Sequence, residues 1–196
     1  MPHPRRALLL LPPLLAALPS ARAQDPAAGI ERFHAALLEV MRNAQRLGTR
    51  GRYERLAPVM EQVFDLPAMA RIAVGPPWSS FSAAEREAVT EAFRRWSIAT
   101  YAARFDGFSG ESFTTEGVQT LPNGDQLVRT RLNRTGGQEP VQLSYLLRGG
   151  RVVDVYLTGT ISELASRRGE FAGLIREGGA ARLVQELDSR TARLLG

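Results

Sequence analysis

The sequence has 196 residues, which is long enough for one domain that buries a sizeable core. It contains no cysteine, and this excludes disulfide bonds and thiolate metal sites. Lysine is absent, so all 25 basic residues are arginines; they face 20 acidic residues without forming a dense basic block, which argues against nucleic-acid binding.

The first 23 residues have the three parts of a secretory signal peptide. The basic start MPHPRR is followed by the apolar run ALLLLPPLLAALP and by Ala21-Arg22-Ala23, so cleavage is expected after Ala23. A membrane anchor is the alternative, but the apolar run is too short to span a bilayer and prolines interrupt it. Cleavage would leave 22 arginines against 20 acidic residues, a net charge of +2. The sequence therefore predicts a periplasmic protein.

Helices are predicted for the next part of the chain. Residues 24–29 (QDPAAG) are expected to be a flexible N-terminus, and residues 30–196 to form a single domain. From Ile30 the apolar residues recur at helical spacing, and this first helix is expected to end near Gly48. The second helix is expected to break near Pro58.

A long helix is predicted after a short one that Gly75 ends. Ser82 and Glu85 form an S-x-x-E capping box, which marks the start of the long helix. Glycines at 107 and 110 are expected to end it. Its apolar positions fall on two neighbouring faces: Val89, Phe93, Trp96, Ile98, Tyr101 and Phe105.

The pattern then changes to the alternation of β-strands. Four strand-like segments, 111–120, 125–134, 139–148 and 151–159, are separated by turn signals, of which Asn123-Gly124 is the strongest. Two helices, roughly 161–176 and 180–194, follow. This order predicts an α+β fold, with a four-stranded antiparallel sheet covered by the N-terminal helices and the two C-terminal helices.

The sequence contains few residues in patterns typical of catalysis. After cleavage the chain would keep one histidine, His34, on an amphipathic helix, and no G-x-S-x-G motif accompanies it. No cluster of His or carboxylate residues has metal-ligand spacing, so we expect no metal and no cofactor. Arg167-Arg168 is compatible with phosphate binding, but such pairs more often form salt bridges.

Apolar surface, in contrast, is abundant. Either the sheet and helices pack into a filled core, or they enclose a cavity for an apolar ligand, and periodicity does not separate the two. In the second case the cavity would be lined by one face of the last two strands and the helices best able to cover it. These residues are Met69, Ile72, Val74, Phe93, Tyr101, Phe105, Val141, Leu143, Tyr145, Leu147, Val153, Val155, Leu157, Phe171 and Ile175.

Two stretches carry a recognisable order of motifs. The first, 64–111, has Phe64-Asp65, Gly75, Trp78 and Thr100-Tyr101, and the second, 152–171, has Asp154, Gly159, Arg168 and Phe171. In this order and spacing they resemble the MlaC/toluene-tolerance auxiliary family, and the resemblance covers roughly residues 30–195. The sequence TISEL in the second stretch is closer to the hopanoid-associated HpnM branch. Arg167 departs from the family, which usually has a tyrosine at that position.

The resemblance implies a carrier without enzymatic activity. Its ligand would be a phospholipid or a hopanoid-like lipid held in an apolar cavity. Its partners would be an inner-membrane ABC transporter bearing an MCE domain and an outer-membrane lipoprotein–porin complex. In this account Arg168 either pairs with Asp154 or contacts the lipid head group.

Two other interpretations stay open at this stage. One is an enzyme or accessory factor of hopanoid biosynthesis, with acid–base chemistry from His34, Asp154 or Glu163. The other is an adaptor with a filled core, which predicts no cavity.

Overall fold

The computed structural model describes residues 25–158 and 161–196. The predicted signal peptide, and Gly159 and Thr160 of the family motif, lie outside the described residues. The described residues form α1 (Pro26–Arg42), α2 (Ala44–Val63), α3 (Leu66–Val74), η1 (Pro76–Ser80), α4 (Ala83–Arg104), β1 (Ser112–Thr120), β2 (Gln126–Asn133), β3 (Val141–Arg148), β4 (Arg151–Leu157), β5 (Ile161–Ser162) and α5 (Glu163–Leu195).

The fold is α+β, as the sequence predicts, but the sheet has five strands rather than four. The strands lie in the order β1-β2-β3-β4-β5, and each is antiparallel to its neighbours. The additional strand, β5, is a two-residue edge that pairs with the end of β4. Two residues are too few for an alternating pattern, so the sequence carries no signal for β5.

The N-terminal helices differ in their boundaries from the prediction. Residues 26–29, expected to be flexible, belong to α1, because the Asp25 side chain accepts a hydrogen bond from the Ala27 amide and caps the helix. The first helix is expected to end near Gly48, but α1 ends at Arg42, and Gly48, whose φ is 60°, lies at a kink inside α2. The break expected near Pro58 is absent, because Pro58 lies inside α2. Leu56 and Met60 on either side of the proline are fully buried, and this packing holds the helix through Pro58.

The capping box of α4 is confirmed. The Ser82 hydroxyl accepts from the Glu85 amide at 3.2 Å, and the Glu85 carboxylate accepts from the Ser82 amide at 2.8 Å. The helix ends at Arg104 with Phe105 as its cap, just before the expected stop at Gly107. The two predicted C-terminal helices are the two arms of α5, which meet at a kink at Gly178 and Gly179.

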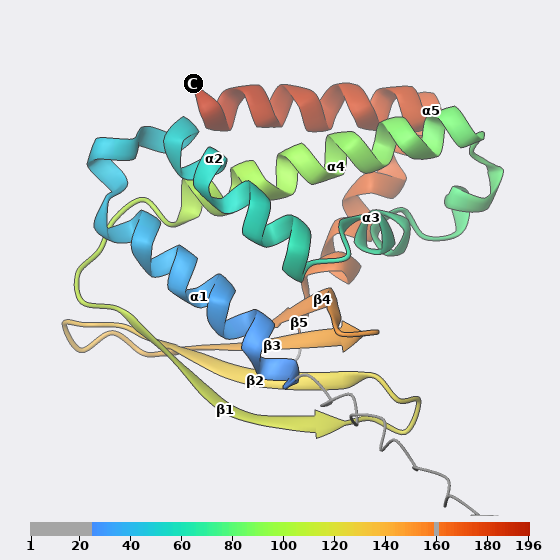
Figure 1. Ribbon diagram of the computed structural model, residues 1–196. Helices are drawn as coiled ribbons and strands as arrows, with labels where there is room; N and C mark the ends of the chain where they lie inside the picture. The colour runs from blue at the N-terminus through green and yellow to red at the C-terminus, as the bar shows by residue number, and fades with distance from the viewer. Residues whose placement is uncertain (1–24, 159–160) are drawn as a thin grey trace, which may run out of the picture.

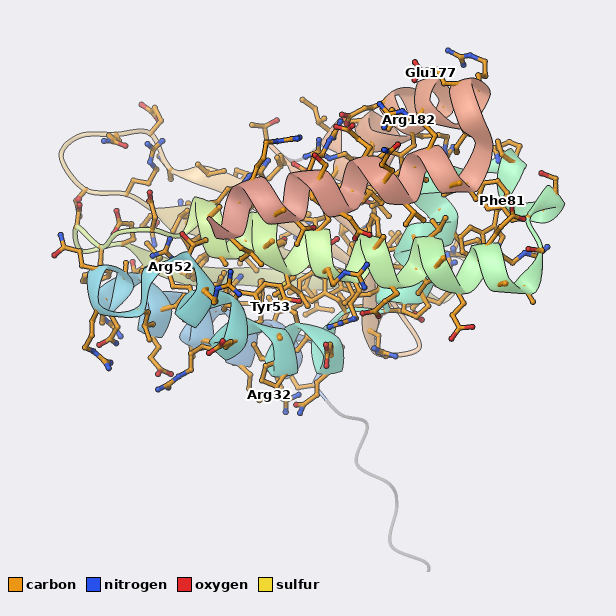
Figure 2. The ribbon with its side chains drawn as sticks, turned by 90° about the horizontal axis from the view of Figure 1, so that it is seen from above. Arg32, Arg52, Tyr53, Phe81, Glu177 and Arg182 are labelled. Carbon is orange, nitrogen blue, oxygen red and sulfur yellow. The ribbon has the colours of Figure 1, made fainter. Side chains whose placement is uncertain are left out.

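All the helices lie on one side of the sheet (Figure 1). The C-terminal arm of α5 and α4 form the layer furthest from the strands, and α1 packs against β1 and β2. Seen from above, α4 and this arm run side by side (Figure 2). The core between these layers includes the fully buried rings of Phe33, Phe64 and Phe171. None of the helices in the described part of the chain is long and apolar enough to cross a membrane.

Candidate functional site

A pocket of about 280 Å³ lies between the helix-facing side of the sheet and the helices. Its walls come from α2, α3, α4, the first turns of α5 and strands β2 to β4. The volume is close to the lower end of the range of about 300–1,000 Å³ for small-molecule sites. Space for a small ligand therefore remains between the sheet and the helices.

Nine of the fifteen residues predicted to line a cavity line this pocket. The strands contribute one wall, in which Leu143 pairs with Leu157 and Tyr145 with Val155. Because directly opposite residues share a face of the sheet, these four side chains lie together. The nine residues are Met69, Phe93, Tyr101, Phe105, Val141, Leu143, Tyr145, Val155 and Leu157.

The other six predicted residues lie outside the pocket. Val153 is displaced by a β-bulge in β4: Leu146 pairs with Asp154 but Leu147 pairs with Val152, so Val153 has no partner and Val152 takes the inner position. The remaining five are core residues or pack against the core. They are Ile72, Val74, Leu147, Phe171 and Ile175.

Eleven further residues line the pocket and were not predicted. Trp96 was detectable, because it lies on the same helical stripe as Phe93. The others depend on long-range packing, which a single-sequence pattern does not reveal. They are the apolar Met60, Phe64, Leu66, Trp96, Leu132 and Leu164, and the polar Ser97, Thr100, Arg104, Glu163 and Arg167.

The polar lining residues come from the second half of α4 and the first turns of α5. Glu163 lies 3.9 Å from Arg104 and 3.7 Å from Arg167. The Arg167 guanidinium also stacks on the Trp96 ring, 4.9 Å from its centroid. The pocket thus has apolar walls and one charged end.

Two tyrosines line the pocket. Burial raises the pKa of Tyr101 well above its ordinary value, and the nearby Glu163 carboxylate adds to this effect. Burial also raises the pKa of Tyr145, so both side chains are neutral. The Tyr101 ring stacks parallel to Phe105, with centroids 5.9 Å apart.

His34 supports the pocket wall from behind. It is 4 % exposed, its Nε2 lies 3.0 Å from the Tyr145 hydroxyl, and its ring stacks on Phe113 at 3.9 Å. Burial lowers the pKa of His34 to about 4, so the imidazole is neutral at ordinary pH. In this position His34 orients Tyr145.

The His34 pKa predicts a loss of stability in acid. A histidine that is neutral in the folded protein stabilises it fully above the unfolded pKa of 6.5, and this stability is lost as the pH falls towards 4. Between pH 7 and pH 4.5 the free energy of unfolding should fall by about 2 kcal/mol more in the native protein than in His34→Gln. Urea unfolding of both proteins at the two pH values measures this, and equal losses would contradict it.

Asp154 and Arg168, predicted as a possible pair, bind different partners. Asp154 accepts hydrogen bonds from the Ser162 hydroxyl at 2.6 Å and from the Leu164 amide at 3.4 Å, so it fixes the start of α5. Arg168 donates to the Ile72 carbonyl at 2.9 and 3.2 Å, near the end of α3. In the described residues the two therefore engage other groups and not each other.

Within residues 25–158 and 161–196, no group of three or more His, Asp or Glu side chains is placed to hold a metal ion. The polar groups near the pocket are instead engaged with one another or with backbone.

The family model described as "MlaC protein" matches residues 31–189. No curated protein matches the chain. Among solved structures, the phospholipid-binding protein from Ralstonia solanacearum in complex with a phospholipid is similar, with a TM-score of 0.74 and 23% sequence identity. That match covers 88% of this chain and 99% of the other. At this identity the likeness shows a shared fold.

Proposed function

The chain belongs to the MlaC family, and from this premise we propose that it binds and transfers lipids, holding acyl chains in the pocket between the sheet and α4. The observation that carries the proposal is the pocket itself, which is apolar along its walls and charged only at one end. Its polar end offers a place for a head group, and its walls offer contacts to a hydrocarbon chain.

The energetics of such a pocket suffice without any chemical step. Removing a methylene from water contributes about 0.8 kcal/mol, so burying ten of them contributes about 8 kcal/mol. The neutral state of Tyr101 and Tyr145 supports this use, because no charge is held against the hydrocarbon at those two positions. Shielding alone is a sufficient driving force for extracting a lipid.

The proposed ligand is a phospholipid or a hopanoid-like lipid, carried between the inner and outer membranes. The solved structure of similar fold holds a phospholipid, which supports the first of the two. The predicted signal peptide supports a periplasmic location. The family resemblance supports an MCE-type ABC transporter and an outer-membrane lipoprotein–porin complex as partners.

An enzymatic function in hopanoid biosynthesis is less well supported. It would depend on His34, Asp154 or Glu163. His34 is buried behind Tyr145, and Asp154 binds Ser162 and the start of α5. Glu163 is the group nearest the pocket, but it lies between two arginines. These contacts support structural rather than acid–base roles for all three.

Native mass spectrometry of the protein purified from a periplasmic extract tests the proposal. We expect a species heavier than the polypeptide by the mass of a lipid, and its loss after extraction with organic solvent. Delipidated protein should then regain mass when incubated with phospholipid vesicles. A polypeptide mass alone, both before and after incubation, would contradict lipid binding.

A further inference from the structure

A shallow groove, here called the arginine groove, lies beside the polar end of the pocket, between α4 and α5. Its charged residues are Arg104, Arg167, Glu186, Arg190 and Arg193. Four of these five carry positive charge, although the whole chain without its predicted signal peptide is nearly balanced. The arginine groove is thus a local concentration of cations.

The arginine groove adjoins the apolar pocket. Trp96, Thr100, Arg104 and Arg167 belong to both linings. Trp96 lies where the two meet, since its ring contributes to the apolar wall while Arg167 stacks against it. A lipid whose chains occupy the pocket and whose head group leaves by the polar end therefore meets these guanidinium groups.

Three carboxylates, of which only Glu186 lines the arginine groove, pair with its arginines and do not neutralise them fully. Glu163 is shared by Arg104 and Arg167, and Glu170 by Arg167 and Arg190. Glu186 is shared by Arg190 and Arg193, and additionally pairs with Arg182 outside the groove. Four groove arginines thus meet three glutamates, which leaves at least one positive charge uncompensated.

Of the four groove arginines, Arg104 and Arg193 lie furthest from their nearest carboxylate. Their nearest carboxylate oxygens lie at 3.9 and 3.6 Å, beyond hydrogen-bond distance. Their side chains are 55% and 63% exposed. Arg193 also donates to the Ser189 hydroxyl at 2.6 Å, but a guanidinium has five N–H donors and keeps others for an anion. Guanidinium groups of this kind match the oxygens of a phosphate.

We propose that the arginine groove binds the phosphate of the head group of a pocket-bound lipid, and that it selects anionic over zwitterionic phospholipids. This inference rests on the proposed lipid-binding function. A zwitterionic head group brings an ammonium that the uncompensated positive charge repels, whereas an anionic head group brings only the phosphate charge. Selectivity follows from this difference, because the acyl chains are identical.

The test compares two short-chain phospholipids with the same acyl chains, a phosphatidylglycerol and a phosphatidylcholine, binding to delipidated protein in calorimetry. We expect phosphatidylglycerol to bind about tenfold more tightly at low salt, and this preference to shrink at high salt. In Arg104→Gln/Arg193→Gln the ratio of the two affinities should fall to near one. These two residues are exposed, so the variant is expected to fold.

The control variant is Arg55→Gln/Arg129→Gln, which removes the same charge at exposed positions away from the groove and should keep the full preference. A preference that survives in Arg104→Gln/Arg193→Gln would overturn the head-group site while leaving lipid binding intact. No binding of either lipid to the native protein would instead refute the proposed function. Inorganic phosphate is the third probe: if it binds the groove while the lipids show no preference, the site belongs to free phosphate and the head-group assignment is wrong.

Discussion

Replacing Leu143 with tryptophan should weaken lipid binding by more than tenfold and leave the fold intact. Leu143 lies in β3 and lines the pocket, where it pairs with Leu157 of β4. The pocket of about 280 Å³ has room for the added indole, which would then occupy the space of the acyl chain. Titration of delipidated protein with a fluorescent lipid measures the loss, and thermal unfolding measures the fold.

Leu147→Trp is the matched control, four residues along the same strand and on the same face. Leu147 is 3% exposed and packs in the filled core rather than at the pocket. Overpacking a filled core costs about 1–3 kcal/mol, so this variant should lose stability, while any protein that remains folded should keep lipid uptake. Equal destabilisation in both variants would mean that the space beside Leu143 is filled, as in an adaptor without a cavity.

Replacing Arg52 with alanine should lower the free energy of unfolding by about 2–4 kcal/mol. Arg52 is 5% exposed and donates to the Ala102 carbonyl at 2.7 Å and the Ala44 carbonyl at 2.9 Å. It thus binds α2 to the end of α4, and Figure 2 shows it at the opposite end of the molecule from Phe81, which precedes α4. Without the Arg52 guanidinium, the carbonyls of Ala44 and Ala102 lose their buried hydrogen-bond donor.

The neighbouring Arg55→Ala serves as the reference for the Arg52 variant. Arg55 forms an ion pair with Glu39 in which both side chains are more than half exposed, and such pairs contribute at most about 1 kcal/mol. Urea unfolding of both variants measures the difference. Because the last turns of α4 carry Tyr101 and Arg104, we also expect Arg52→Ala to release lipid faster. Equal stability of the two variants would contradict the structural role of Arg52.

The features best predicted from sequence are those set by a few adjacent residues. The capping box at Ser82 and Glu85 is one, since its two hydrogen bonds involve residues three apart. The turn at Asn123-Gly124 is another: Gly124 has a φ of +84°, and the Leu121 amide donates to the Asp125 carbonyl at 2.8 Å. In both cases local geometry alone determines the structure.

Strand β4 shows why the alternating pattern was insufficient. Val152, Val153, Asp154 and Val155 are all buried, because Asp154 is covered by the start of α5 on the face that the pattern assigns to solvent. The bulge at Val153 then changes which residues face the helices. An alternation of apolar and polar residues predicts neither a β-bulge nor burial of the second face of a strand.

The pocket was only partly predictable for a related reason. Helical periodicity identifies the buried face of α4, but not whether that face meets another side chain or empty space. Phe171 and Phe93 carry the same apolar signal, yet only Phe93 lines the pocket. The position of Arg168 depends on contacts with residues that are far away in the sequence. It donates to the Ile72 carbonyl, and its side chain lies so close to Gly75 that a Cβ atom on residue 75 would be 3.1 Å from it.

Locating a bound acyl chain most directly tests whether it lies in the pocket between the sheet and α4. A phospholipid with a photoreactive diazirine near the end of one acyl chain is bound to delipidated protein and irradiated, and the labelled residues are located by mass spectrometry of tryptic peptides. We predict labels on Leu143, Tyr145 and Val155, which line the pocket, and their loss in Leu143→Trp. Labels confined to the opposite face of the sheet, at Leu127 or Leu146, would contradict an acyl chain enclosed between the sheet and α4.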